Sequence, residues 1–440
     1  MIADPNQRVM PYVVVTRANQ GQTMKTERII SSNGGTVVSS YPQVGVVVAY
    51  SAADDFSARL RQDKTIEAVG ATRTAKIPAG FFAQRAKAEF TGAPYPRSNE
   101  VPAEGQGWDT LAIDVAKAHE VTTGSKDVTV GILDTGVDDT HPEIQHAVDT
   151  SQSVTCVAGW ADQTYGAWRN TRDGHGTHLA GTIAAARDGK GTVGIAPDVR
   201  IAAVKMADGD DEETPESEVC GYIWAAEHGF RIVNNSYRTY PWRFSCPSDP
   251  DQAAILKAVS RAAAYAQSRN VLFVASAGNA GTDWDTRTQD VDSPADTTPV
   301  KRTIDTTCLR LPHQLPGVIG ASALDQNLRK ATFSNFGFGS VGLGAPGANT
   351  WSTWPNGQYR PASGTSMASP QVAGVAALVA SRFPELSADQ IRERLYATAT
   401  PAPCPVNYPV TAGICKAEGV RTNFYGAGFV NAAAAVGATP

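Results

Sequence analysis

The chain contains 440 residues, of which 42% are hydrophobic and 18% are charged, and its formal net charge at pH 7 is −5. The composition is that of a soluble globular protein, and the length favours two domains because one hydrophobic core rarely grows this large. The small negative charge argues against a nucleic-acid partner. The lack of an apolar run of about 18 residues argues against a membrane span.

The first residues, Met1 to Pro5, lack the basic start and the apolar stretch of a secretory signal peptide. If the protein is exported, we expect that an initiating methionine has replaced the signal. A cytoplasmic origin is the alternative.

Residues 11–75 combine four apolar runs with two helical patterns. Strands are expected at residues 12–16, 35–40, 44–50 and 66–71, and helices at residues 23–32 and 53–62. This β-α-β-β-α-β order predicts a small ferredoxin-like α+β domain. The following residues, 76–106, are expected to form a linker, because prolines interrupt them at positions 78, 94, 96 and 102.

From Trp108 onward, strand and helix patterns alternate. Strands are expected at residues 128–133, 200–206, 232–235, 271–275 and 318–323, and helices at residues 216–228, 252–268, 371–382 and 388–398. This alternation predicts an α/β domain with a parallel sheet that helices cover on both faces.

The first candidate functional residue, Asp134, ends the apolar run at residues 128–133 and is followed by a turn glycine, Gly136. Such a run is typical of a strand buried on both faces of a parallel sheet. Ligands of open α/β sheets bind beyond the carboxyl ends of the strands, where Asp134 would lie. A lone Asp in this position is usually a turn residue, so it needs partners.

A second motif, residues 173–182, places His175 at the start of a helix. Small residues at positions 176, 180 and 181 would let this helix pack closely beside the sheet. His178 in the same helix is expected to be a packed structural histidine, and His141 is expected to be part of a loop.

The third motif, residues 363–370, contains Ser366 just before the predicted helix at residues 371–382. Pro370 would lie in the first turn, where a missing N–H group costs nothing. A serine at this place lies beside unpaired N–H groups that can hold an oxyanion. A capping serine is the alternative for this motif alone.

Six cysteines occupy mostly polar, loop-like surroundings, without Cys-x-x-Cys or zinc spacing. An even number in such loops favours disulfides and an oxidising compartment. Fifteen pairings are possible. Cys404–Cys415 is the favoured local pair, because four prolines enclose its short loop. The hypothesis then pairs the other four cysteines as Cys156–Cys220 and Cys246–Cys308.

Asp134, His175 and Ser366 together supply an orienting carboxylate, a base that titrates near neutral pH, and a nucleophile that needs such a base. The three motifs resemble those of the subtilase (subtilisin-like) serine peptidases over roughly residues 107–435. The chain order Asp, His, Ser is the order known for subtilisin.

This resemblance implies a secreted endopeptidase that acts through an acyl-enzyme and needs no cofactor for its chemistry. His175 would be the general base and then the acid, Ser366 the nucleophile, and Asp134 the orienting group. Asn279, which follows the expected strand at residues 271–275, matches the family's oxyanion asparagine. A catalytically silent binding or regulatory protein on the same scaffold is the alternative.

The resemblance also implies a proenzyme with three parts. Residues 1–75 would be a propeptide that chaperones folding and then inhibits, with the tail beyond Ala71 entering the cleft. Residues 76–106 would contain or adjoin the processing site, and residues 107–440 would be the peptidase domain. The expected partners are protein or peptide substrates and the chain's own propeptide, and the expected state is a monomer. An unrelated small binding domain is the alternative for residues 1–75.

Ser236, Tyr237 and Arg238 occupy the place of the family's substrate-pairing strand, on which a peptide adds as a further strand. Relatives commonly have Ser-Leu-Gly there, so the bulk of Tyr237 and the charge of Arg238 are expected to alter the subsites. Gly278 is expected to contact substrate as well.

Relatives often bind structural calcium in the loop that follows the histidine helix. Asp188 and Glu143 have the oxygen ligands that calcium prefers, whereas Lys190 adds an opposing charge. A solvated turn is the alternative.

Overall fold

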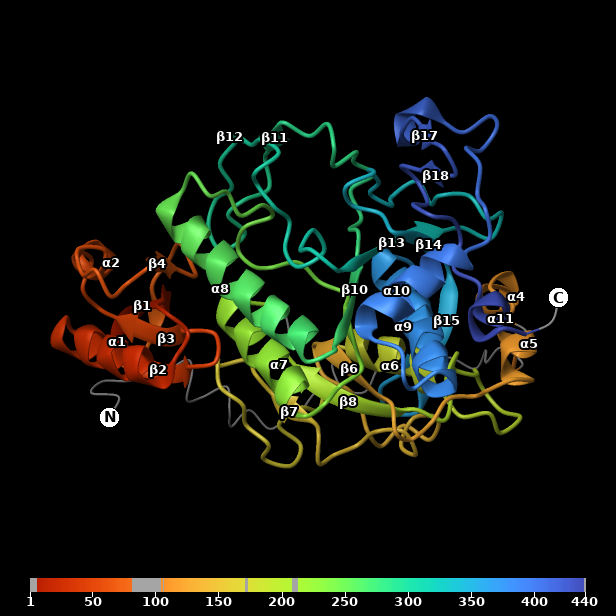
Figure 1. The fold of residues 1–440 in the computed structure, drawn as a ribbon, viewed down its shortest axis with the longest axis horizontal. Coiled ribbons are helices and arrows are strands. Elements are labelled where there is room, and N and C mark those ends of the chain that lie inside the picture. Colours follow the sequence, from red (N-terminus) through yellow and green to blue (C-terminus); the bar gives the residue numbers. More distant parts are fainter. Residues whose placement is uncertain (1–5, 81–103, 106, 171–172, 208–212, 439–440) are drawn as a thin grey trace.

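The computed structural model describes residues 6–80, 104–105, 107–170, 173–207 and 213–438. Most of the predicted linker, residues 81–103 and 106, lies outside this range. Figure 1 shows a small N-terminal domain, in red, beside a larger domain that is built around a central sheet.

The N-terminal domain has the predicted order of elements. Its elements are β1 (Arg8–Val15), α1 (Gln20–Ser32), β2 (Gly35–Tyr41), β3 (Val46–Ser51), α2 (Phe56–Leu60) and β4 (Ala68–Ala71). The strands pair antiparallel in the order β2-β3-β1-β4, and a short strand, β5 (Ile77–Pro78), returns to pair with β1. The ferredoxin-like prediction is confirmed, although α2 is shorter than expected.

The two faces of this small sheet are buried against different partners, because alternate residues of a strand point to opposite sides. Tyr12 and Val14 pack with α1 and α2. Val13 and Val15 pack instead into a cluster with two helices of the larger domain, α7 (Pro215–Glu227) and α8 (Pro250–Ser268). The N-terminal domain therefore lies on the outer side of these helices (Figure 1).

The larger domain contains a seven-stranded sheet in the order β14-β13-β10-β9-β6-β8-β7, and all of its strand pairs are parallel. The strands are β6 (Thr129–Asp134), β7 (Val154–Thr155), β8 (Arg200–Lys205), β9 (Ile232–Asn235), β10 (Leu272–Ser276), β13 (Ile319–Leu324) and β14 (Leu343–Pro346). The five expected strands correspond to β6, β8, β9, β10 and β13, and their apolar runs are buried as predicted. The two edge strands, β7 and β14, were not predicted.

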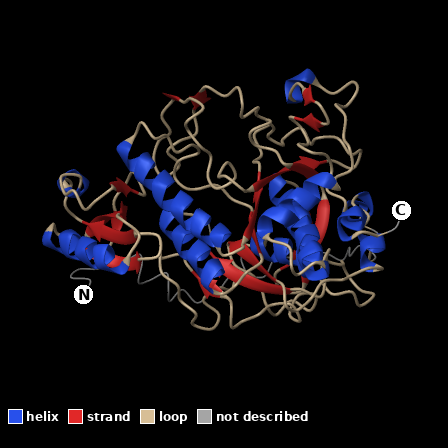
Figure 2. Cartoon of the chain, viewed as in Figure 1, coloured by secondary structure: helices blue, strands red, loops and turns tan. Residues whose placement is uncertain are grey.

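Helices cover the two faces of this sheet (Figure 2). One face packs against α6 (His175–Ala184) and α9 (Thr365–Arg382), with α10 (Ala388–Ala397) behind them. The other face packs against α7 and α8. Ser387 caps α10 through a capping box with Gln390, which confirms the predicted start of this helix.

The predicted start of α9 is wrong. The helix begins at Thr365 rather than Gln371, so Pro370 lies inside it and not in its first turn. Proline has no N–H group to donate to the carbonyl of Ser366 four residues earlier. That carbonyl accepts a hydrogen bond from the Ser236 hydroxyl instead, at 3.0 Å, so the helix continues past the proline.

Several short elements complete the larger domain. They are α4 (Trp108–Ala112), α5 (Val115–His119), α11 (Ala432–Val436), a 3-10 turn (Val410–Ala412) and the antiparallel pairs β11 (Gln289–Asp290) with β12 (Arg302–Thr303), β15 (Thr350–Trp354) with β16 (Gln358–Ala362), and β17 (Ala417–Glu418) with β18 (Arg421–Thr422). Within the described ranges, no helix has the length and apolar character needed to cross a lipid bilayer.

All six cysteines form disulfides. The pairs are Cys156–Cys220, Cys246–Cys308 and Cys404–Cys415, which confirms the pairing hypothesis.

Candidate active site

Asp134 lies at the carboxyl end of β6, as predicted, and its side chain is buried. Its Oδ1 atom lies 2.7 Å from Nδ1 of His175 and accepts a hydrogen bond from the backbone N–H of Thr135 at 2.8 Å. The carboxylate therefore fixes the orientation of the imidazole ring.

His175 is the first residue of α6, and its backbone N–H donates to Oδ1 of Asp173 at 2.8 Å. The helix fits closely here, because a Cβ on Gly176 would lie 2.2 Å from the Gly136 carbonyl oxygen. The His175 side chain is 30% exposed, so one edge of the ring remains accessible to a substrate.

Two opposing effects act on the pKa of His175. Burial lowers it, but the negative charges of Asp134, Asp173 and Glu213 together outweigh burial and raise the pKa to about 9. These carboxylates would stabilise the imidazolium that forms when the ring accepts a proton.

Ser366 is the second residue of α9, and Ser236 holds it from two sides. The Ser366 hydroxyl donates to the Ser236 carbonyl oxygen at 3.1 Å, while the Ser236 hydroxyl donates to the Ser366 carbonyl oxygen. Across the described part of the chain, no hydrogen bond joins His175 to Ser366. Catalytic hydrogen bonds of this kind commonly tighten only when substrate is bound.

The amide of Asn279 has a fixed orientation. Its Oδ1 atom accepts hydrogen bonds from both the backbone N–H and the hydroxyl of Thr365, each at 2.8 Å. The Nδ2 atom consequently faces Gly364, where an added Cβ would lie 3.3 Å away. The donor end of this amide is therefore available beside the first turn of α9.

A pocket of about 500 Å³ joins these groups. It is lined by Thr135, Asp173, His175, Glu213, Ser236, Tyr237, Arg238, Arg243, Ser276, Gly278, Asn279, Ala280, Trp284, Arg310, Asn335 and Ser366. Every predicted site residue except Asp134 lines it, and Asp134 contacts it through His175. The chain thus places a hydroxyl, an imidazole and an amide donor around one cavity.

Tyr237 differs from expectation. Its hydroxyl lies 2.9 Å from the Tyr222 hydroxyl on α7 and donates to the Asn235 side chain at 3.1 Å. Burial raises the pKa of Tyr237 well above its ordinary value. The end of the ring is therefore engaged in the helix layer, and the bulk of this side chain is directed less toward the pocket than the sequence suggested.

Several residues at the pocket were not identified from the sequence. Thr365 lies in the third motif but outside the pocket lining, and its role comes from the hydrogen bonds that it donates to the amide oxygen of Asn279. Arg310 and Trp284 line the pocket, are distant from the three motifs and carry no motif of their own. Asn335 donates from Nδ2 to the Ala277 carbonyl at 2.9 Å and so supports the wall from behind.

His178 and His141 have the structural roles that the sequence predicted. Nε2 of the buried His178 lies 3.2 Å from the Thr350 carbonyl, and burial is the main reason that its pKa falls to about 4. Nε2 of the buried His141 lies 2.9 Å from the Gln358 carbonyl.

The residues proposed for calcium do not fit a calcium site well. Glu143 is buried and hydrogen-bonded to the Tyr359 hydroxyl, whereas Asp188 is exposed. Burial, with the nearby charge of Asp188, raises the pKa of Glu143 to about 7, so this carboxyl is partly protonated near neutral pH. No group of three or more His, Cys, Asp or Glu side chains suited to a metal ion occurs among the described residues.

Comparison with known proteins identifies clear relatives. The model of the Subtilase family matches residues 125–428. Subtilisin DY from Bacillus licheniformis is 35% identical over 274 residues, which cover 62% of this chain and 84% of that protein. Subtilisin BL from Lederbergia lenta is 32% identical over 335 residues, which cover 76% of this chain and 99% of that protein.

Solved structures extend the likeness to nearly the whole chain. The epidermin leader peptide processing serine protease from Staphylococcus aureus matches with a TM-score of 0.73 at 21% identity, covering 97% of this chain and 98% of that one. At this identity the likeness is one of fold, and its extent includes the N-terminal domain.

Proposed function

The chain belongs to the subtilase family and is a subtilisin-like serine endopeptidase, and from this premise we propose that Asp134, His175 and Ser366 carry out its reaction. His175 takes the proton of the Ser366 hydroxyl as that oxygen attacks the scissile carbonyl. It then gives the proton to the leaving amine, and water hydrolyses the acyl-enzyme by the same route.

Asn279 and the backbone N–H of Ser366 are proposed to bind the oxyanion that forms in each step. The two hydrogen bonds from Thr365 support this role, because they hold the amide oxygen and leave its N–H groups directed at the pocket side of α9. Donors that are already in place cost no reorganisation when charge develops.

Substrate would lie along Ser236–Arg238 on one side of the pocket and Gly278 on the other. All four residues line the pocket that contains Ser366. Main-chain pairing with such segments gives affinity that depends little on sequence, and the pocket then selects a side chain.

The single observation that carries the catalytic proposal is the 2.7 Å contact of buried Asp134 with His175, in the same pocket as Ser366. The test is labelling with a serine-directed sulfonyl fluoride, followed by intact-mass and peptide mass spectrometry. We expect loss of peptidase activity and one adduct on Ser366, and neither labelling nor activity in Ser366→Ala. Inactivation by a chelator with no effect of the serine reagent would contradict the proposal.

The N-terminal domain is proposed to be an inhibitory propeptide, residues 1–75, of a self-processing enzyme. Its contact with α8 supports a specific fit, because Gly70 approaches the backbone of Asp251 so closely that an added Cβ would lie 2.3 Å from the carbonyl oxygen. Ion pairs surround this contact, including Arg61 with Asp251 at 2.6 Å and Lys257 with Glu67 at 2.7 Å.

The chain beyond Ala71 was expected to enter the cleft, and residues 72–80 do not do so. Arg73 lies 3.9 Å from buried Glu216, Thr74 donates to Asp296 at 2.6 Å, and β5 then returns to β1. None of these residues lines the pocket around Ser366. We therefore propose that the processing site lies later in the junction, before Trp108, in the predicted linker at residues 76–106.

Secretion and action as a monomer are also proposed. The three disulfides support secretion, since such bonds form and persist in oxidising compartments. Structural calcium remains a proposal that the loop at Asp188 does not favour, and a calcium titration followed by thermal unfolding would test it.

A further inference from the structure

The segment that carries Asn279, residues 277–282, is an irregular turn beyond the end of β10. Gly278 and Gly281 have φ angles of +96° and +60°, in the left-handed region that glycine adopts at little cost. The backbone of such a turn leaves the regular pairing of the sheet, so its N–H and C=O groups need partners from elsewhere in the fold. The position of the Asn279 amide therefore depends on how this turn is held.

One side chain, that of the buried Asn335, binds the turn on both sides of Asn279. Its Nδ2 atom donates to the Ala277 carbonyl oxygen at 2.9 Å. Its Oδ1 atom accepts hydrogen bonds from the backbone N–H groups of Ala280 and Thr282, at 2.9 and 3.0 Å. These three hydrogen bonds from one amide fix the turn before and after the oxyanion residue.

An asparagine amide matches the needs of this turn. It combines a carbonyl oxygen that accepts two hydrogen bonds with an NH₂ group that donates. The backbone N–H of Asn335 donates as well, to the Gly278 carbonyl oxygen at 2.9 Å. The fit is close, since a Cβ added to Gly278 would lie 2.4 Å from Nδ2 of Asn335. Loss of the side chain would leave backbone groups of the turn unpaired and allow the turn to shift.

Other contacts hold Asn335 itself. Nζ of the buried Lys330 donates to the carbonyl oxygens of Ala331 and Ser334, at 3.1 and 2.8 Å. The same ammonium lies 5.0 Å from the centre of the Phe336 ring, within reach of a cation–π attraction. The Ser334 hydroxyl donates to the Asn335 carbonyl oxygen at 3.1 Å. These contacts fix the backbone from which the Asn335 side chain reaches the turn.

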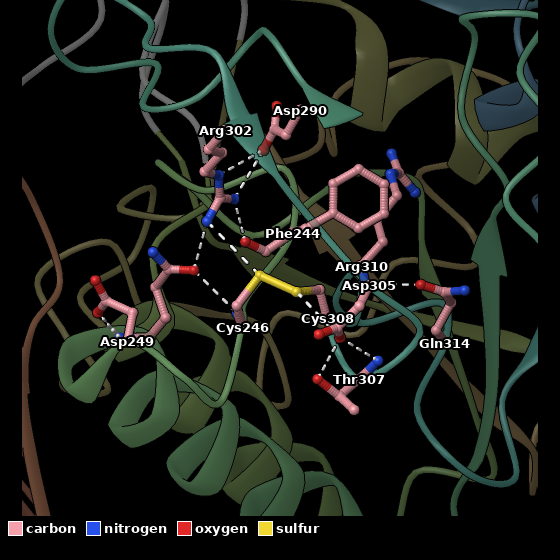
Figure 3. Close-up of a disulfide and its surroundings, with 11 residues drawn as sticks. Phe244, Cys246, Asp249, Asp290, Arg302, Asp305, Thr307, Cys308, Arg310 and Gln314 are labelled. Carbon is pink, nitrogen blue, oxygen red and sulfur yellow. Dashed lines mark hydrogen bonds and ion pairs between the residues drawn. A yellow bond between two sulfur atoms is a disulfide. The ribbon is translucent and has the colours of Figure 1, made fainter. Parts of the chain in front are cut away.

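A second segment supports the point where the turn leaves β10. Nη1 of Arg310 donates to the Ser276 carbonyl oxygen at 3.3 Å. Figure 3 shows Arg310 and the Cys246–Cys308 disulfide, which joins the chain two residues earlier. Arg310 thus supports the end of the strand, whereas Asn335 holds the turn itself.

We propose that Asn335 is a positioning residue for the oxyanion site. Thr365 holds the oxygen of the Asn279 amide, and Asn335 holds the backbone on either side of this residue. Donors that are in place before the reaction stabilise developing charge without the cost of reorganisation. A shift of the turn should therefore weaken transition-state stabilisation more than substrate binding. This inference rests on the proposed function, in which Asn279 binds the oxyanion.

The experiment is a double-mutant cycle on the mature enzyme, with kcat and KM measured for one peptide substrate. We expect Asn335→Ala to lower kcat about tenfold with little change in KM. In the Asn279→Ala enzyme, the same substitution should lower kcat less than about twofold, because the group that Asn335 positions is already gone. Asn335→Asp keeps the oxygen that accepts from Ala280 and Thr282, and it should lower kcat by a smaller factor than Asn335→Ala.

Asn423→Ala is the matched control. Asn423 is also a buried asparagine whose amide bridges backbone groups, those of Ile414 and Lys416, but it does not line the pocket. Its substitution should lower the Tm and leave kcat unchanged. Circular dichroism shows whether each variant is folded, and Asn335→Asp carries the same cycle if Asn335→Ala does not fold.

An equal fall in kcat in the wild-type and Asn279→Ala enzymes, or a rise in KM with kcat unchanged, would overturn this inference. Both results leave the proposed function intact as long as Asn279→Ala itself lowers kcat. An unchanged kcat in Asn279→Ala would instead overturn the proposed oxyanion role. Hydrolysis that persists undiminished in Ser366→Ala would overturn the proposed function itself.

Discussion

The pocket around Ser366 and the surface between the N-terminal domain and helices α7 and α8 are built in opposite ways. The pocket is a network of short polar contacts, in which Asp134, His175, Asn279 and Thr365 each have defined partners. The domain surface combines a patch of small apolar side chains with exposed ion pairs. The pocket must hold reacting atoms in register, whereas a surface that binds a propeptide, as proposed for the N-terminal domain, would have to hold it strongly and still release it.

Asp134→Asn, which replaces one carboxylate oxygen by an amide nitrogen, should have the largest effect. The substitution keeps the shape of the side chain but removes its charge and favours the wrong tautomer of the His175 imidazole. We expect kcat to fall by about 10⁴. Steady-state kinetics would measure the fall in kcat. Unchanged inhibition of the variant by an added N-terminal domain is the control that the surface on α7 and α8 is intact. A loss of less than tenfold would show that Asp134 does not orient His175.

Asn279→Ala should cost less, because only one oxyanion donor is removed. We expect kcat to fall by about 10² to 10³ with little change in KM, which is the magnitude known for subtilisin. Thr365→Val, which removes one of the two hydrogen bonds that hold the amide, should lower kcat by a smaller factor. If KM rose while kcat stayed constant, Asn279 would be a ground-state binding residue instead.

The pH dependence of activity tests the electrostatics of the pocket. His175 must be neutral to accept a proton, and the raised pKa means that the ring holds its own proton to higher pH. Activity should therefore increase as pH rises, with an apparent pKa above 6.5 and toward 9 in the kcat/KM profile of the mature enzyme. Asp173→Asn should shift this limb to lower pH. A limb at or below pH 6.5 would contradict the assignment.

The domain surface should respond to apolar changes more than to ionic ones. Val15→Ala, in the patch against α7 and α8, should weaken inhibition by an added N-terminal domain about tenfold, because buried methyl groups are lost. Glu67→Ala removes exposed ion pairs to Lys257 and Arg261, and should cost less than about fivefold. The measurement is the inhibition constant of each isolated variant domain, after circular dichroism has shown that the domain is folded. A larger loss of inhibition for Glu67→Ala than for Val15→Ala would show that charge dominates this surface.

Much of the fold could be predicted because its signals are local. Apolar runs marked five strands of the central sheet, β6, β8, β9, β10 and β13, and a helical pattern at residues 388–398 marked α10. The hairpin of β15 and β16 was missed, since its Trp and Thr residues form no apolar run and Pro361 interrupts the second strand. The start of α9 was misplaced because the hydroxyl that compensates for Pro370 comes from Ser236, far away in the sequence.

The candidate site shows the same division. Asp134, His175, Ser366 and Asn279 each stand in a recognisable motif, and the fold brings them to one pocket. Thr365 holds Asn279, and Arg310 lines the pocket beside Ser276, through contacts between segments that are distant in sequence. No local pattern reports such contacts, so these residues required the structure.

The fate of the purified full-length precursor tests most directly whether Ser366 cuts the chain itself. Wild-type protein should cleave itself within residues 76–106, as read by amino-terminal sequencing of the active enzyme. Purified Ser366→Ala precursor should remain whole when incubated alone and should be cut when mature enzyme is added. A Ser366→Ala chain that still matures alone, or an active enzyme that keeps its original amino terminus and releases no N-terminal domain, would contradict self-processing by Ser366.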